Sequence, residues 1–288
     1  MKLIIAKSAG FCFGVKRAME MALDAAQKYP HPLYTLGPLI HNPQAVEYLD
    51  GLGIKVKNRI EQITGGTVIL RSHGVSLKDL EKAKKKGLKI IDATCPIVKR
   101  AHFFAKFLRR NGYALLIVGD ADHPEVEAIR SYLDKEVGVV ERPETLKRLG
   151  PWKKVGIIAQ TTQSFDLFKE VVAASLSRAK EVRVFNTICD ATTVRQKEAV
   201  EIAKKVECMI VAGGFNSGNT QRLAGICHEV QPRTHHIEIA QELNPKWLVK
   251  KERIGLTAGA STPSWIIQDV EREIRRLKNR RLEASPMP

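Results

Sequence analysis

Short apolar runs alternate along this chain with longer segments in which apolar residues recur at the spacing of a helix face. The clearest case is the apolar run at residues 89–92, which is followed by Cys95 and then by Pro96. Beyond this proline, apolar residues fall on one helical face at Val98, Ala101, Ala105 and Leu108. Proline suits the first turn of a helix, where its missing N–H is not needed. The pattern therefore predicts that Cys95 lies between the end of a strand and the start of a helix.

The same pattern occurs around Cys12 and Cys189, which lie about ninety residues away on either side. Each follows a short strand-like run and precedes a segment with helical apolar spacing. Downstream of each cysteine, two more strand-like runs end in polar clusters. The first of these junctions carries His41, His123 or Ser217, and the second carries His73, Thr161 or Ser261. A further β-like run lies between them, at residues 54–57, 137–140 and 234–239.

Strands that alternate with helices predict an α/β fold with parallel sheets and right-handed crossovers. Three such repeats predict three similar lobes of parallel sheet with flanking helices, arranged with pseudo-threefold symmetry around a central cavity. Ligands bind at the carboxyl ends of such strands, so we expect the three cysteines to meet there. The expected lobes comprise residues 1–88, 89–180 and 181–280, followed by a basic, flexible tail at 281–288.

Composition places the chain among globular proteins of the cytoplasm. Of its 288 residues 44% are hydrophobic and 27% charged. No apolar run approaches the roughly 20 residues needed to span a bilayer, and the N-terminus lacks the pattern of a signal peptide. The five cysteines are odd in number and far apart, which favours a reducing compartment over a disulfide framework. Cys208 and Cys227 lie away from the predicted junctions, and we expect ordinary core or surface positions for both.

The net charge of +16 predicts attraction to polyanions. Much of it lies on helix faces, where it is typical of a solvated surface. A nucleic-acid-binding protein is one alternative. Aromatic residues make up only 6% of the chain and do not alternate with basic ones, as stacking platforms for nucleic acid require. We therefore expect no nucleic-acid partner and no membrane contact, and a monomer for a self-contained three-lobed chain.

Three thiolates in one cavity predict a site for a soft metal, either zinc or an iron–sulfur cluster. Three ligands to a four-iron cluster would leave one iron open to substrate, which favours catalysis. Polar side chains near helix N-termini predict an anion site suited to phosphate. These side chains belong to His41, His73, His123, Thr161, Ser217, Asn219 and Ser261. Glu125, next to a junction histidine, is the candidate proton donor. We expect surface or capping roles for His31, His102, His228, His235 and His236.

Nine short motifs, in order along the whole chain, resemble the 4-hydroxy-3-methylbut-2-enyl diphosphate reductase family. They are AGFCFGVKRA, HNP, SHGVS, DATCPIVK, HPEVE, QTT, TICDATTVRQ, NSGN and AGASTP. The resemblance implies the last step of the non-mevalonate isoprenoid pathway, in which an allylic hydroxyl is removed with two electrons and two protons. The products are isopentenyl and dimethylallyl diphosphate. It also implies one 4Fe-4S cluster per chain, held by Cys12, Cys95 and Cys189, whose apical iron binds the substrate hydroxyl.

The resemblance further assigns roles to the remaining candidates. Glu125 delivers protons, Thr161 lies near the hydroxyl and His123 lines the pocket; all three are candidate catalytic residues, and His123 and Thr161 also contact substrate. The diphosphate-binding set is matched by His41, His73, Ser217, Gly218, Asn219 and Ser261. Gly218 stands where the family usually has a serine, and Ala128 and Ser131 stand where it usually has glycines. Electrons would come from an acidic protein such as a ferredoxin or flavodoxin, since no G-x-G-x-x-G nucleotide motif is present.

Two further alternatives share the three cysteines. A zinc hydrolase would combine them with a histidine, and would be colourless and free of sulfide. A pure electron carrier or redox sensor would use the open cluster but would leave the predicted diphosphate-binding side chains without a purpose.

Overall fold

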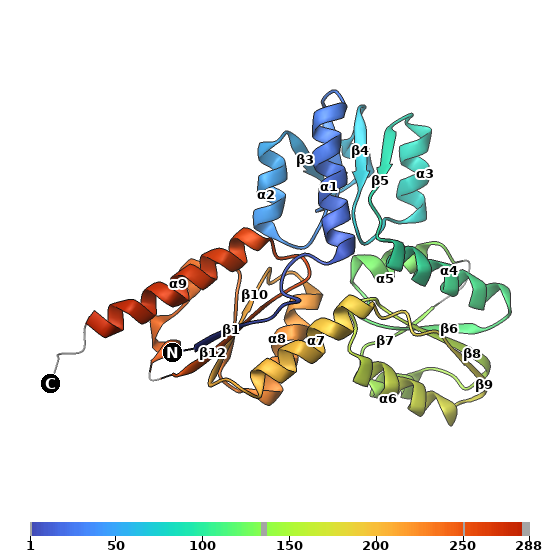
Figure 1. Ribbon diagram of the computed structural model, residues 1–288. Helices are drawn as coiled ribbons and strands as arrows, with labels where there is room; N and C mark the ends of the chain where they lie inside the picture. The colour runs from blue at the N-terminus through green and yellow to red at the C-terminus, as the bar shows by residue number, and fades with distance from the viewer. Residues whose placement is uncertain (1, 134–136, 250, 284–288) are drawn as a thin grey trace. The chain divides into compact units, whose positions relative to one another are not determined.

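The computed structural model describes residues 2–133, 137–249 and 251–283. Within these residues the strands form three four-stranded sheets, every one of them parallel, with helices between successive strands (Figure 1). The predicted class, α/β with three similar sets of parallel strands, is confirmed.

One sheet has the order β3-β2-β4-β5. Its strands are β2 (Leu33–Leu36), β3 (Ile54–Lys57), β4 (Thr67–Leu70) and β5 (Lys89–Asp92). The helices that precede or connect them are α1 (Phe13–Lys28), α2 (Pro43–Gly51) and α3 (Leu77–Lys85), with a 3₁₀ turn at Ile60–Gln62. All four residues of β4 are buried, as expected for an inner strand of a parallel sheet that is covered on both faces.

A second sheet repeats this order as β7-β6-β8-β9. Its strands are β6 (Ala114–Val118), β7 (Gly138–Val140), β8 (Trp152–Ala159) and β9 (Ala179–Val184). The helices are α4 (Pro96–Arg110), α5 (Pro124–Ser131) and α6 (Phe165–Leu176), with a 3₁₀ segment at Pro143–Arg148. Helix α4 has the predicted buried face, formed by Val98, Ala101, Ala105 and Leu108.

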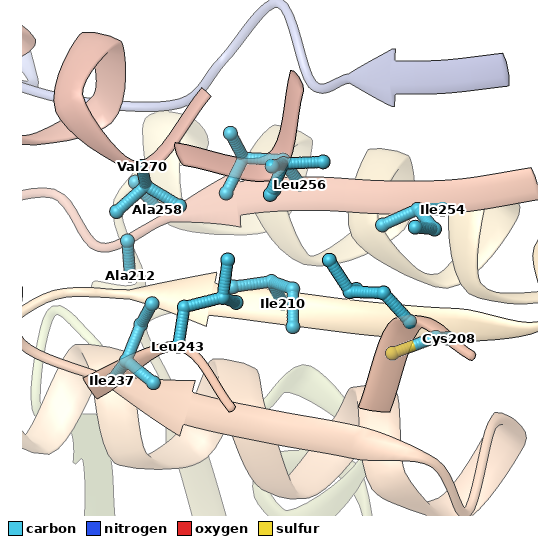
Figure 2. Packing of buried hydrophobic residues seen from close by; sticks show 11 residues of the cluster. Cys208, Ile210, Ala212, Ile237, Leu243, Ile254, Leu256, Ala258 and Val270 are labelled. Atoms are coloured by element: carbon cyan, nitrogen blue, oxygen red, sulfur yellow. The ribbon is translucent and has the colours of Figure 1, made fainter. Parts of the chain in front are cut away.

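The third sheet has the order β1-β12-β10-β11, and it joins the two ends of the chain. Its strands are β1 (Lys2–Ile5), β10 (Cys208–Ala212), β11 (Thr234–Ile237) and β12 (Arg253–Ala258). The helices are α7 (Asp190–Ala203), α8 (Gly218–Val230) and α9 (Ser264–Glu283), with 3₁₀ turns at Ala240–Glu242 and Pro245–Leu248. Figure 2 shows Ile210, Ile254 and Leu256 from neighbouring strands packed together in the core of this sheet.

The lobe boundaries expected at residues 88/89 and 180/181 do not coincide with the sheet boundaries. Strand β5 pairs with β4 and β9 pairs with β8, so these two strands complete the sheet that precedes the next cysteine, whereas β1 pairs with β12 in the last sheet. Parallel strands are joined by crossover connections, and each crossover can add one more strand at the edge of the same sheet. Strands β5 and β9 are such edge strands, and the chain passes to the next sheet only after them. Part of the expected tail, residues 281–283, continues α9, and residues 284–288 lie outside the described residues.

Contacts divide the chain into two compact units. The first unit comprises Met1–Cys12, His41–Ala45 and Asp190–Pro288, and contains the sheet with β1. The second unit comprises Phe13–Ile40 and Val46–Cys189, and contains the other two sheets. In the described part of the chain, no helix combines the length and the apolar character needed to cross a membrane.

Candidate functional site

Each of the three candidate cysteines lies directly before a helix. Cys12 precedes α1, Cys95 is the N-cap of α4 and Cys189 precedes α7. All three thiols are partly exposed, and none takes part in a disulfide. The partial positive charge at a helix N-terminus favours the thiolate, which is the form that binds metals. These positions are the ones that the spacing predicts.

Cys95 is held in the second unit by close backbone contacts. Its N–H donates to the carbonyl of Ser72 at 2.9 Å, which ties it to the loop after β4. Helix α1 approaches it through Gly14: a Cβ built on this glycine would lie 2.5 Å from the Cys95 Sγ. Real Cβ atoms essentially never come this close, so this helix position has room for glycine alone unless the sulfur moves. The Arg17 guanidinium donates to the carbonyl of Thr94 at 3.4 Å.

Cys189 belongs to a hydrogen-bonded chain that ends on the candidate proton donor. The N–H of Cys189 donates to the Thr161 carbonyl at 2.9 Å. Thr161 in turn holds both oxygens of the Glu125 carboxyl, because its N–H donates to Oε1 and its hydroxyl to Oε2, each at 2.7 Å. Glu125 is only 1% exposed. The predicted proximity of Glu125 and Thr161 is thus observed, and their hydrogen bonds reach the peptide of a candidate metal ligand.

Two predicted histidines accompany this pair. His123 is the N-cap of α5, and its Nδ1 accepts from the N–H of Glu125 at 3.1 Å. The rings of His73 and His123 meet edge to face, with centroids 5.6 Å apart. The second unit therefore gathers His73, His123, Glu125 and Thr161 as the sequence predicts.

The first unit gathers a second group of predicted residues at the N-terminus of α8. Ser217 is the N-cap of this helix, and its Oγ accepts from the N–H of Thr220 at 3.3 Å. The Ser261 hydroxyl donates to the His41 carbonyl at 2.9 Å and lies 3.5 Å from the Ser217 Oγ. A Cβ on Gly214 would lie 2.9 Å from the His41 carbonyl oxygen, so a glycine lets this segment approach closely.

Asn219 gives this group the character of an anion site. It is 7% exposed, and its buried Nδ2 has no hydrogen-bond partner among the described residues. Leaving such a donor unpaired costs about 1–3 kcal/mol, which a bound acceptor would recover. Gly218 begins α8, and the first N–H groups of a helix have no partner within it. Together with the helix dipole, these donors favour a phosphate.

The sequence interpretation missed two residues that hold the loop before Cys12. The Arg195 guanidinium, on a residue that is 3% exposed, donates to the carbonyls of Ser8 and Gly10 at 2.6 and 2.7 Å. Glu198, one turn further along α7, accepts from the N–H groups of Lys7 and Ser8 at 2.8 Å. The motif that contains Arg195 was recognised, but neither partner could be inferred because they lie more than 180 residues away.

The two departures in α5 have a structural account. Ala128 is buried, and a Cβ on Gly74 would lie 3.7 Å from its Cβ, which is ordinary contact. The Ser131 hydroxyl donates to the Ala128 carbonyl at 2.7 Å and accepts from the N–H of Leu77 at 3.0 Å. Ser131 thereby satisfies an otherwise unpaired N–H at the start of α3. The helix that carries Glu125 is thus joined to the segment that follows His73.

The remaining cysteines and histidines differ from these candidates. Cys208 and Cys227 are fully buried, and burial raises the pKa of the Cys208 thiol to about 11 and that of Cys227 to about 12. His235 stacks on Trp247 with centroids 3.9 Å apart. The expectation of a surface or capping role is wrong for His102, whose Nε2 is buried.

The three candidate cysteines fit an iron–sulfur cluster chemically. Each thiol lies directly before a helix, and the Cys95 thiol lies against Gly14, whose lack of a side chain leaves space for the sulfur. In the described ranges, no group of three or more His, Cys, Asp or Glu side chains is arranged to hold a metal ion. The predicted site residues form one group within each unit: Cys12, His41, Ser217, Gly218, Asn219 and Ser261 in the first, and His73, Cys95, His123, Glu125, Thr161 and Cys189 in the second.

The fold and these residues define an α/β protein with three cysteines at helix starts, a buried carboxyl and a group of polar side chains at the N-terminus of α8. The chain belongs to the LytB protein family, whose model matches residues 3–275. The predicted resemblance is therefore confirmed. Relatives named 4-hydroxy-3-methylbut-2-enyl diphosphate reductase are 54% identical over 281 residues in Geobacter sulfurreducens and over 277 residues in Geobacter metallireducens. These alignments cover 98% and 96% of this chain, and 99% and 98% of the relatives.

Two solved structures share the fold. One, described as (E)-4-hydroxy-3-methyl-but-2-enyl diphosphate reductase, the terminal enzyme of the non-mevalonate pathway, is 47% identical with a TM-score of 0.71. The match covers 96% of this chain and all of that one. The other, the E-1-hydroxy-2-methyl-but-2-enyl-4-diphosphate reductase from Plasmodium falciparum, is 27% identical with a TM-score of 0.87, and the match covers 99% of this chain and 88% of that one.

Proposed function

We propose that this protein reduces 4-hydroxy-3-methylbut-2-enyl diphosphate to isopentenyl diphosphate and dimethylallyl diphosphate. Two electrons and two protons break the allylic C–O bond, and the hydroxyl leaves as water. The observation that carries the proposal is the buried chain from Glu125 through Thr161 to the peptide of Cys189. It joins a proton-carrying group to a thiol of the kind that binds redox-active iron. The named relatives, aligned over almost their entire length, support the same reaction.

Cys12, Cys95 and Cys189 would hold one 4Fe-4S cluster. When bound, this cluster would supply the electrons and an open iron position for the substrate hydroxyl. The support for this assignment is chemical: three thiols at helix N-termini, where the thiolate is favoured, set apart from two buried thiols whose pKa is raised.

Glu125 and Thr161 are suited to deliver the proton that the leaving hydroxyl needs. When Glu125 carries a proton, its O–H can donate to the Thr161 oxygen at the observed 2.7 Å. The Thr161 hydroxyl is then free to donate its own proton to the substrate. The N–H of Thr161 holds the other carboxyl oxygen in place, so the carboxyl keeps its orientation in both protonation states. Positioned proton transfer of this kind contributes typically 10²–10⁴-fold to a rate.

The diphosphate would lie at the N-terminus of α8. Ser217 and Ser261 offer hydroxyls there, Asn219 offers its buried Nδ2, and Gly218 offers its peptide N–H. His41, His73 and His123 would line the substrate pocket. Binding energy from the diphosphate, far from the reacting carbon, orients the substrate without taking part in the chemistry.

The electron donor is proposed to be an acidic protein such as a ferredoxin or flavodoxin. The net charge of +16 supports this, because opposite charge raises the rate of encounter. A cytoplasmic location and a monomeric state complete the proposal.

The test is anaerobic turnover of the purified protein with the allylic diphosphate and a chemically reduced dye. We expect both isopentenyl and dimethylallyl diphosphate as products, in an amount that matches half of the electrons consumed. Dye oxidation without either product would contradict the reductase assignment and favour an electron carrier. Hydrolysis of the substrate without dye oxidation would favour a zinc hydrolase.

A further inference from the structure

The second unit contains a cavity of about 440 Å³ between α3, α4 and the strands β4 and β5. Much of its wall is hydrocarbon, from Leu70, Val75, Leu80 and Ile90. Its volume falls at the lower end of the 300–1,000 Å³ range that is typical of small-molecule sites, which are also mostly apolar with a few placed polar groups. None of these four residues belongs to the candidate functional site.

One polar group lies buried in this wall. The Nε2 atom of His102 is inaccessible and has no hydrogen-bond partner among the described residues. Its ring meets Tyr132 edge to face, with centroids 5.1 Å apart. The Nε2 is 3.8 Å from the place that a Cβ on Gly74 would take, which is ordinary contact. Burial, with a smaller contribution from Lys106, lowers the pKa of His102 to about 4, and the ring is therefore neutral at pH 7.

Lysines give the cavity a positive rim. Lys99 is neutralised, because it forms an ion pair with Asp92 at 2.5 Å. Lys84 and Lys106 also line the cavity, and neither forms an ion pair within the described residues. The Lys106 Nζ lies 4.3 Å from the centroid of the Tyr132 ring, which keeps the ammonium at the cavity wall. Two lysines without an ion pair thus line a largely apolar space, whose wall also includes Thr94, His102 and Tyr132.

We propose that this cavity binds a small amphipathic phosphate, an alkyl or prenyl chain that ends in a phosphate group. The chain would fill the apolar interior, beside the ring of His102, and the dianionic head would lie with Lys84 and Lys106. A phosphate matches two lysines without an ion pair better than a carboxylate does, because it carries about two negative charges at pH 7. The cavity uses none of the donors Ser217, Asn219 and Ser261 of the proposed diphosphate site, which belong to the first unit.

Decyl phosphate is the probe, titrated calorimetrically under anaerobic conditions into the full chain as purified. We expect one molecule to bind per chain. The double substitution Lys84→Ala with Lys106→Ala should weaken binding about a hundredfold, since each charge-assisted hydrogen bond contributes about tenfold. Decanoate, with one negative charge, should bind more weakly than decyl phosphate.

A matched control separates the site from general charge. Lys85→Ala with Arg100→Ala removes the same net charge from the same two helices at exposed positions outside the cavity, and should leave the affinity for decyl phosphate within about twofold of the wild type. Asn219→Ala, in the proposed diphosphate site, should also leave it unchanged. Equal weakening by the control pair, or loss of binding in Asn219→Ala with retention in the Lys84 and Lys106 variant, would overturn the proposal. So would the absence of measurable binding to the wild type.

Discussion

Replacement of Gly14 by alanine adds one methyl group to the start of α1, and this methyl is aimed at Cys95. The new Cβ would lie 2.5 Å from the Cys95 Sγ and 3.1 Å from its Cβ. Ordinary contact between such atoms is about 3.7 Å, so the sulfur must move by roughly 1 Å. Metal–ligand distances tolerate deviations of about 0.2 Å. The displacement is therefore several times larger than a cluster ligand can accept.

The effect on folding should be small, because two contributions of opposite sign meet. Alanine is favoured over glycine within a helix by about 0.8–1 kcal/mol, which offsets part of the cost of the displaced sulfur. We therefore expect Gly14→Ala to retain the circular dichroism of the wild type while iron and acid-labile sulfide per chain fall to a small fraction of the wild-type values. The assay is metal and sulfide analysis of anaerobically purified protein, together with the visible absorption that a cluster gives.

Gly225→Ala is the matched control. Gly225 is exposed in α8, and a Cβ built on it meets nothing within 4 Å. This substitution should raise the free energy of unfolding by about 1 kcal/mol and leave iron and sulfide at wild-type levels. If Gly14→Ala holds its full complement of iron and sulfide, then Cys95 is not a ligand in the position described, and the reasoning is refuted.

Three other predictions concern the proton donor, the anion site and the buried histidine. Glu125→Gln should keep iron and sulfide but lower kcat by 10²–10⁴-fold, since an amide cannot supply a proton; an unchanged kcat would exclude it as the donor. Ser261→Ala should raise KM about tenfold with little change in kcat, through loss of one phosphate contact; a change in kcat alone would contradict this role. The pKa of His102 is about 4 in the folded chain and about 6.5 in the unfolded chain, so the unfolded state binds more protons between these values. The free energy of unfolding, measured by urea denaturation, should therefore fall by up to about 3 kcal/mol as pH drops from 6.5 to 4. His102→Gln should reduce this dependence on pH, and the same dependence in the variant and the wild type would contradict the buried neutral ring.

Local pattern was sufficient to place the elements and the cysteines. The apolar run before Cys95 and the helical spacing after Pro96 correspond to β5 and α4, and the repeats around Cys12 and Cys189 lie in equivalent places. Periodicity determines such elements because each strand and helix must bury one set of side chains. The exposed thiols and the two buried ones were also separated correctly.

Pairing between distant segments was not accessible in the same way. The expected lobe boundaries differ from the sheet boundaries because β1 adds to the last sheet beside β12, a choice that the pattern of β1 itself does not encode. Arg195 and Glu198 were missed because their hydrogen bonds join α7 to the loop before Cys12, more than 180 residues away. His102 was misplaced because a single histidine on a helix carries no mark of the cavity that other segments build around it.

Iron and acid-labile sulfide in anaerobically purified wild-type protein, measured with its visible spectrum, show whether the three cysteines hold a cluster. We expect about four irons and four sulfides per chain, with broad visible absorption. Zinc without sulfide, even after anaerobic reconstitution with iron and sulfide, would contradict it.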